Sequence, residues 1–139
     1  MKPDFEDFKI GEYFWYSEMV RSETAERHRI DNTPPPEAMS NACYTAQVAD
    51  CIREDLGLPM VVTSWFRAPK VNKKAGGSST SDHMNGHTFD FCVPGKKLQE
   101  VFDFIRDNYH YDQIGINKRR NYIHYSIKRE GNREQVITY

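Results

Sequence analysis

The sequence contains no long apolar run and no segment typical of export. No apolar stretch approaches the length of about 18 residues at which a membrane-spanning helix is recognised. No charged segment followed by an apolar one opens the chain, so a secretory signal peptide is not expected either. We therefore predict that the protein is synthesised in a cytoplasm without a signal peptide and does not enter a membrane.

Cysteine and net charge are also scarce. The three cysteines, Cys43, Cys51 and Cys92, form an odd set, and two of them lie at helical spacing in an apolar pattern. That pattern is typical of buried thiols and argues against a disulfide framework. A net charge of −1 gives the chain no overall attraction for polyanions. We therefore expect no nucleic-acid partner and interpret the basic cluster at residues 118–120 as a solvated turn.

The chain nevertheless has enough apolar material for one domain. It has 139 residues, of which 38% are apolar, and it shows no internal repeat or low-complexity segment. We predict a single domain over residues 1–139, with residues 1–32 as an N-terminal arm that packs on it. Packing on the domain and a glycan-stacking surface are both open interpretations of the aromatic residues in this arm, which are Phe5, Phe8, Tyr13, Phe14, Trp15 and Tyr16.

Apolar periodicity predicts helices and strands in irregular alternation. A long helix should start after Thr33, which can cap it, and end near residue 56, with an apolar stripe of Met39, Ala42, Cys43, Ala46, Ala49, Ile52 and Leu56. Further helices are predicted at residues 69–74 and 95–108, and strands at 60–63, 88–93, 111–116, 122–128 and before residue 139. This order predicts an α+β fold, with a small, mainly antiparallel sheet, helices packed on one face and a metal site on the other.

The candidate metal site is built from two histidines and an aspartate. His83 follows a run of small hydroxyl residues, and Asp90 lies seven positions later in an apolar, strand-like segment. His124 lies in a strictly alternating segment that puts it on one face with Tyr122 and Ser126. Two imidazoles and a carboxylate can hold Zn2+ and leave one position open for water, as catalytic zinc sites do. Ordinary surface histidines beside a capping aspartate are the alternative that this spacing leaves open.

A family resemblance covers most of the chain and narrows this choice. The sequence resembles the peptidase M15 family, and within it the small phage-type zinc peptidases that cut the peptide part of bacterial peptidoglycan. The matching segments are IDNTPP at residues 30–35, VTSWFRAPKVN at 62–72, GGS at 76–78, SDH at 81–83, GHTFD at 86–90, DQ at 112–113 and IHYS at 123–126.

The resemblance implies a fold, a cofactor and a set of roles. The fold would be that of D-Ala-D-Ala carboxypeptidases and Hedgehog domains, and zinc would be held by His83, Asp90 and His124. Arg67, for which an ordinary surface position is the simpler interpretation, would reach the active site and bind a carbonyl or carboxylate oxygen of the substrate. Ser81 and Tyr122 are assigned with it to substrate binding. The expected partners are peptidoglycan stem peptides, and the protein is expected to be a monomer.

One departure from the family pattern concerns the chemistry itself. Most relatives carry a glutamate shortly after the Asp-Gln pair, which serves as general base, whereas this chain has Gly115, Ile116, Asn117 and Lys118 there. An asparagine cannot take a proton from water, so His87, Asp112 or a residue brought from elsewhere would have to act instead. A solvent-facing loop position is the alternative interpretation of His87.

Two functions follow as hypotheses. The first is a zinc-dependent carboxypeptidase or endopeptidase that cleaves D-amino-acid bonds of peptidoglycan, made in a host cytoplasm and acting at the cell wall or periplasm during phage-associated lysis. The second is a catalytically weak or inactive zinc-containing binding or structural protein on the same fold, as Hedgehog signalling domains illustrate.

Overall fold

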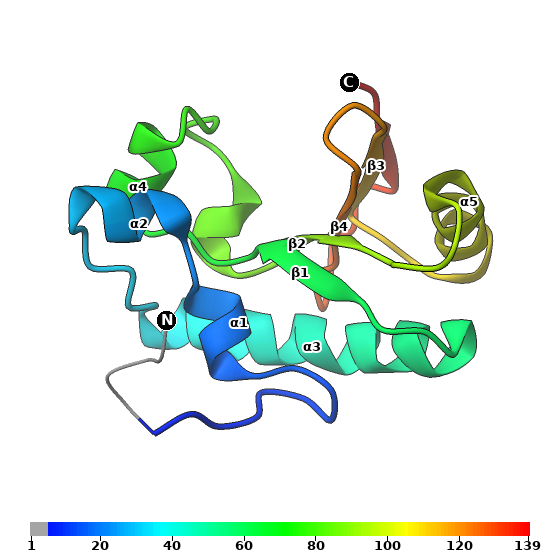
Figure 1. Cartoon of the computed structure of the whole chain (residues 1–139), viewed down its shortest axis with the longest axis horizontal. Coiled ribbons are helices and arrows are strands. Elements are labelled where there is room, and N and C mark those ends of the chain that lie inside the picture. The colour runs from blue at the N-terminus through cyan, green and yellow to red at the C-terminus, as the bar shows by residue number, and fades with distance from the viewer. Residues whose placement is uncertain (1–5) are drawn as a thin grey trace.

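The computed structural model describes residues 6–139 and shows an α+β arrangement around one five-stranded sheet (Figure 1). In chain order the elements are α1 (Tyr16–Val20), α2 (Glu23–His28), α3 (Pro36–Leu56), β1 (Val61–Ser64), α4 (Pro69–Lys74), the 3-10 helix η1 (Asp82–Asn85), β2 (Thr88–Cys92), α5 (Leu98–Asn108), β3 (Gln113–Asn117), β4 (Tyr122–Ser126) and β5 (Gln135–Ile137). Among residues 6–139, no helix is both long and apolar enough to cross a membrane.

The sheet is mixed, with the strand order β1-β2-β4-β3-β5. The pairs β1/β2, β2/β4 and β4/β3 are antiparallel, whereas β5 pairs with β3 in parallel. The predicted α+β class and a mainly antiparallel sheet are confirmed, since three of the four strand pairs are antiparallel, and the parallel edge strand β5 is the exception. The parallel pairing arises because the chain after β4 returns to the start of β3. There the N–H of Gln135 donates to the carbonyl of Asp112 at 2.9 Å.

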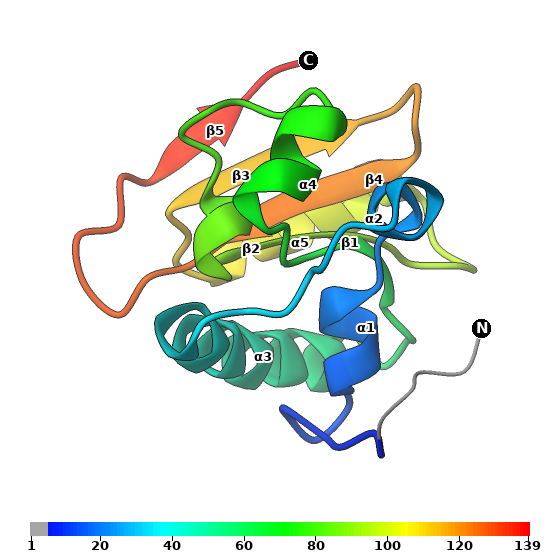
Figure 2. The same cartoon turned by 90° about the vertical axis from the view of Figure 1, so that its left-hand side faces the viewer.

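Alternation along the strands separates an apolar face from a polar one. Phe89, Phe91, Ile123 and Tyr125 are fully buried and belong to one core with the buried residues of α3 and α5. Figure 2 shows α4 in front of the sheet and α5 behind it, with α3 beneath. Because neighbouring residues in a strand point to opposite faces, Asp90 and His124 point away from the side chains that flank them.

The long helix α3 begins later than the sequence predicts and lacks the predicted side-chain cap. Thr33 does not cap it, because its N–H and hydroxyl donate to the Asp31 carboxylate at 3.0 and 2.6 Å in a turn that precedes the helix. The helix starts at Pro36 and ends at Leu56, followed by Gly57 with a φ of 68°. Most of the predicted stripe is confirmed, since Ala42, Ala46, Ala49 and Ile52 are fully buried.

The N-terminal arm packs against α3 over the residues that the structure describes. Phe14 and Met19 are fully buried, and the Asp50 carboxylate accepts the N–H groups of Glu12 and Tyr13 at 2.7 and 3.0 Å. Phe8 stacks on Tyr16 with ring centroids 4.7 Å apart and stays half exposed. Phe5, which belongs to the predicted aromatic cluster, lies outside the described residues.

Gly86 lets the turn after η1 pack directly on α3. Its φ is 78°, a left-handed conformation, and a Cβ added there would lie 2.3 Å from the carbonyl oxygen of Ala38. Gly57 has a similar φ of 68° but open space around it. The two glycines thus share a backbone conformation and differ in steric surroundings.

We expect Gly86→Ala to lower the free energy of unfolding by about 1–3 kcal/mol more than Gly57→Ala, the range found for overpacked sites. Both variants pay the cost of a left-handed alanine, so the difference isolates the collision with α3. Urea denaturation followed by circular dichroism measures both values. Equal losses would show that α3 and the turn can separate at no cost.

Candidate metal centre

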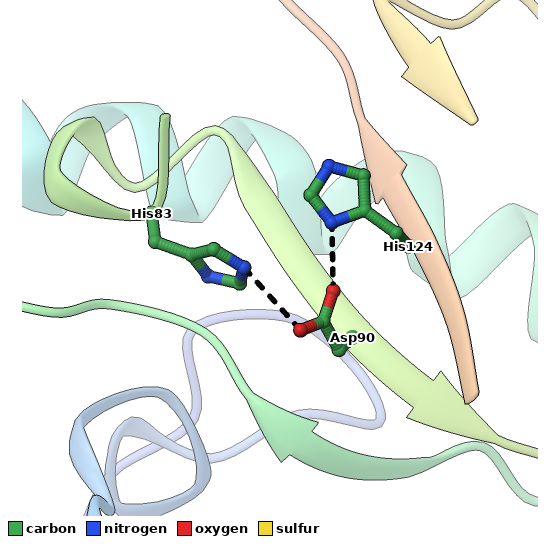
Figure 3. A group of neighbouring side chains, drawn as sticks. All are labelled: His83, Asp90 and His124. Atoms are coloured by element: carbon green, nitrogen blue, oxygen red, sulfur yellow. Dashed lines mark hydrogen bonds and ion pairs between the residues drawn. The ribbon is translucent and has the colours of Figure 1, made fainter. Parts of the chain in front are cut away.

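Three side chains from separate elements converge on the polar face of the sheet (Figure 3). His83 comes from η1, Asp90 from β2 and His124 from β4, and their ligand atoms all lie within 4.8 Å of one another. Asp90 is directly opposite His124 in the antiparallel pair β2/β4, which places both side chains on one face. The structure thus brings together the three residues that the sequence singles out as ligands.

The ring of His83 is held in one orientation by a backbone carbonyl. Its Nδ1 donates to the carbonyl oxygen of Trp65 at 2.6 Å, because a carbonyl can only accept. Nε2 then faces Oδ2 of Asp90 at 3.3 Å, and the side chain is almost fully buried. In the neutral ring Nε2 carries a lone pair, so this approach of two electron-rich atoms requires a proton or a cation between them.

His124 approaches the other oxygen of the same carboxylate. Its Nδ1 lies 2.9 Å from Oδ1 of Asp90. Its Nε2 is buried and has no hydrogen-bond partner among residues 6–139. Such an orphaned ring nitrogen is costly in a folded protein unless something else satisfies it.

Asp90 is held in its charged form. Burial by itself would raise the pKa of this carboxyl. The charges of His83 and His124 and the hydrogen bonds from both rings outweigh burial and hold the pKa well below its ordinary value. An ionised carboxylate between two imidazoles is a suitable ligand set for Zn2+, which accepts nitrogen and oxygen donors. The residues present therefore fit the metal that the family resemblance implies.

Arg67 lies beside this cluster. Its Nη2 is 4.0 Å from Oδ2 of Asp90, while Nε donates to Ser64 at 3.2 Å and Nη1 to the Asn72 side chain at 3.3 Å. A Cβ on Gly77 would lie 2.1 Å from the Asn72 side-chain oxygen, so the glycine leaves room for the Asn72 side chain that accepts the hydrogen bond from Arg67. The guanidinium is thus fixed at the edge of the cluster with a partly exposed face.

Ser81 and Tyr122 both lie near the cluster, in different roles. The Ser81 hydroxyl accepts the N–H of His83 at 3.2 Å and so caps η1. The Tyr122 hydroxyl accepts a bond from the Asn117 amide at 3.4 Å, and its ring shares the face of His124. Their assignment to substrate binding stays a prediction.

Asp112 does not belong to the cluster. It is fully buried, and Arg133 engages both of its oxygens, with the shortest contact at 2.6 Å. Burial alone would raise the pKa of this carboxyl, but the hydrogen bonds from Arg133 and the charges of Lys128 and Arg133 lower it overall. Because both oxygens are committed to this ion pair, the geometry weighs against Asp112 as a general base.

His87 is partly buried and directly precedes β2. Its Nδ1 is buried without a hydrogen-bond partner among residues 6–139, and burial lowers the pKa of the ring. Asp82 and Asp112 oppose this lowering of the pKa, whereas Lys128 adds to it. Its catalytic role stays a prediction as well.

The structure adds contacts that the sequence did not indicate. Trp65 is fully buried, its indole donates to the carbonyl of Gly86 at 3.1 Å, and its own carbonyl orients His83. Arg133 also contacts Asp82 at 2.9 Å and thereby joins the start of η1 to β3 through Asp112. Backbone acceptors and distant ion pairs leave no local sequence signal. Asn72, in contrast, stands in the resembling segment and could have been singled out.

Comparison with known proteins agrees with this geometry. The search of curated proteins finds no match to the chain. The family model described as Peptidase M15 matches residues 12–126, which include every member of the His83, Asp90 and His124 cluster as well as Arg67. A match over most of the chain, together with a ligand set that suits a metallopeptidase, shows that the chain belongs to the peptidase M15 family.

Proposed function

We propose that the protein is a zinc-dependent peptidase that hydrolyses peptide bonds of bacterial peptidoglycan. The observation that carries this proposal is the convergence of His83, Asp90 and His124 beside a fixed guanidinium, that of Arg67. The substrate class rests on the resemblance to phage-type members of the family. On the same basis we propose synthesis in a host cytoplasm without a signal peptide, action at the cell wall or periplasm, and a monomeric state.

The chain's own residues would divide the work of the reaction. His83, Asp90 and His124 would hold the metal, and the Trp65 carbonyl would keep the His83 ring in the correct tautomer. Arg67 would orient a carbonyl or carboxylate oxygen of the peptide through charge-assisted hydrogen bonds. When bound, zinc supplies Lewis-acid chemistry, in which it polarises a carbonyl and lowers the pKa of a water molecule.

A second candidate is a zinc-containing binding protein with weak or no turnover. The observation that favours it is the absence of any carboxylate at residues 113–123, the segment in which most relatives carry the general base. Asn117 donates to Tyr122 and accepts the N–H of Arg120 at 3.0 Å, so it cannot serve as a base. The binding protein would keep the metal and the substrate contacts and lack only proton transfer.

We expect the purified protein to bind about one zinc ion per chain and to melt at a higher temperature with zinc than without it, since a ligand of the native state alone stabilises that state. His124→Ala should abolish both effects. His110→Ala is the matched control, because the side chain of His110 is 88% exposed and lies outside the cluster. Elemental analysis and thermal melting measure the outcome, and zinc retention by His124→Ala would refute the ligand set.

We expect the zinc-loaded protein to release amino acids or short peptides from purified peptidoglycan or its stem peptides. Arg67→Ala should lower kcat/KM by about 10- to 100-fold, the loss that corresponds to one charged hydrogen bond. Arg120→Ala, in the exposed turn after β3, serves as the control. Unchanged muropeptides in mass spectrometry after a long incubation would favour the binding protein instead.

We expect Asn117→Glu to raise turnover, because a general base contributes roughly 100- to 10,000-fold in many enzymes. The matched control is Asn117→Gln, which has the same length and cannot accept a proton. Zinc content should stay the same in both variants. If the glutamate variant cleaves no faster than the glutamine variant, proton transfer in this site does not depend on position 117.

A further inference from the structure

Tyr139 and Arg67 reach the polar face of the sheet from opposite edges. The strand order places β1 at one edge and β5 at the other, with the ligand-bearing strands β2 and β4 between them. Arg67 follows the end of β1, and Tyr139 follows the end of β5. The metal cluster therefore lies between these two side chains along the sheet.

The register of β5 directs Tyr139 toward the cluster. Ile137 is opposite Gly115, and Gly115 is opposite His124, so all three positions share one face. The period of two along an extended chain puts Tyr139 on that same face as Ile137. A Cβ added to Gly115 would lie 3.1 Å from Cε2 of Tyr139, so the missing side chain at this position makes room for the tyrosine ring next to the strand of His124.

The surroundings of the Tyr139 hydroxyl are those of the site. Its ring packs edge-on against Tyr122, with centroids 5.9 Å apart and an interplanar angle of 75°. Burial raises the pKa of Tyr139 most, the hydrogen bond with Tyr122 and the charge of Asp90 raise it further, and Arg67 opposes them. The hydroxyl is therefore protonated at neutral pH, and a substrate oxygen would take the place of Tyr122 as the acceptor of its hydrogen bond. The residue as a whole is 63% exposed, so a ligand can reach it.

We propose that Tyr139 is a substrate-binding residue whose hydroxyl donates a hydrogen bond to a carbonyl or carboxylate oxygen of the bound peptide, from the side of the cluster opposite Arg67. Two donors on either side of the cluster would orient an extended peptide across it. Tyr139 lies outside residues 12–126, the part of the chain that the family model matches, so this contact would be a feature of the chain's own C-terminal segment. The proposal rests on the proposed peptidase function.

The test removes the hydroxyl and retains the ring. Tyr139→Phe and wild type are compared in the full-length, zinc-loaded protein, by calorimetric binding of a peptidoglycan stem peptide and by kcat and KM for its cleavage. We expect Tyr139→Phe to weaken peptide binding and raise KM by about 3- to 10-fold, as the loss of one neutral hydrogen bond does, with kcat much less affected. Zinc content and melting temperature should match wild type. Tyr13→Phe removes a hydroxyl that donates to Glu54 on α3 and should change none of these values.

Each other outcome has a definite meaning. If Tyr139→Phe binds the peptide as wild type does, the hydroxyl contact is refuted, even if Tyr139→Ala is impaired, because the ring alone would then matter. A fall in zinc content or melting temperature of Tyr139→Phe would assign the residue a structural role and overturn the proposal. If wild type itself neither binds nor cleaves the peptide, the proposed function is refuted, and so is the Tyr139 contact that rests on it. If wild type binds the peptide but Tyr139→Phe binds it equally well, only the Tyr139 contact is refuted and the proposed function stands.

Discussion

The antiparallel pairing of β2 with β4 is the constraint on which the site depends. It sets Asp90 directly opposite His124, so that one carboxylate oxygen lies 2.9 Å from the imidazole without help from any loop. The same pairing buries Phe89, Phe91 and Tyr125 on the reverse side. Because the side-chain period of a strand is two, a register slip of one residue would move the ligands into the core and the aromatic rings into the site. Core packing and ligand placement are thus one requirement.

The remaining ligand lies on a short 3-10 helix, which has little stability of its own and is held by the surrounding structure. The Trp65 carbonyl orients the His83 ring, and the glycine turn at Gly86 packs on the start of α3. On the other side, Arg133 connects Asp82, the first residue of η1, to the buried Asp112. This third connection comes from the segment after β4. A loop that carries a metal ligand is therefore held from three directions, which limits the rearrangement that metal binding would require.

The polar groups around the cluster include more hydrogen-bond donors than groups able to accept a proton. Hydrogen-bond donors are well represented, with Arg67 on one side and Tyr122 and Tyr139 on the other. Acceptors for a proton are scarce, because Asp112 is committed to Arg133 and Asn117 is not basic. Under the proposed function, such a site would be better equipped to hold a peptide than to move a proton. This imbalance is why binding without rapid turnover is the main competitor to the peptidase function.

The sequence by itself determined the helices α4 and α5, the pairing segments around His124 and the identity of the three candidate ligands, because apolar periodicity and residue chemistry are local properties. The family resemblance, also contained in the sequence, selected those histidines among the five. Only the tertiary structure decided that β5 runs parallel to β3, that Arg133 occupies Asp112, and that a backbone carbonyl orients His83. These features depend on which distant segments meet, and neither a carbonyl group nor a long-range ion pair is written in the residues nearby.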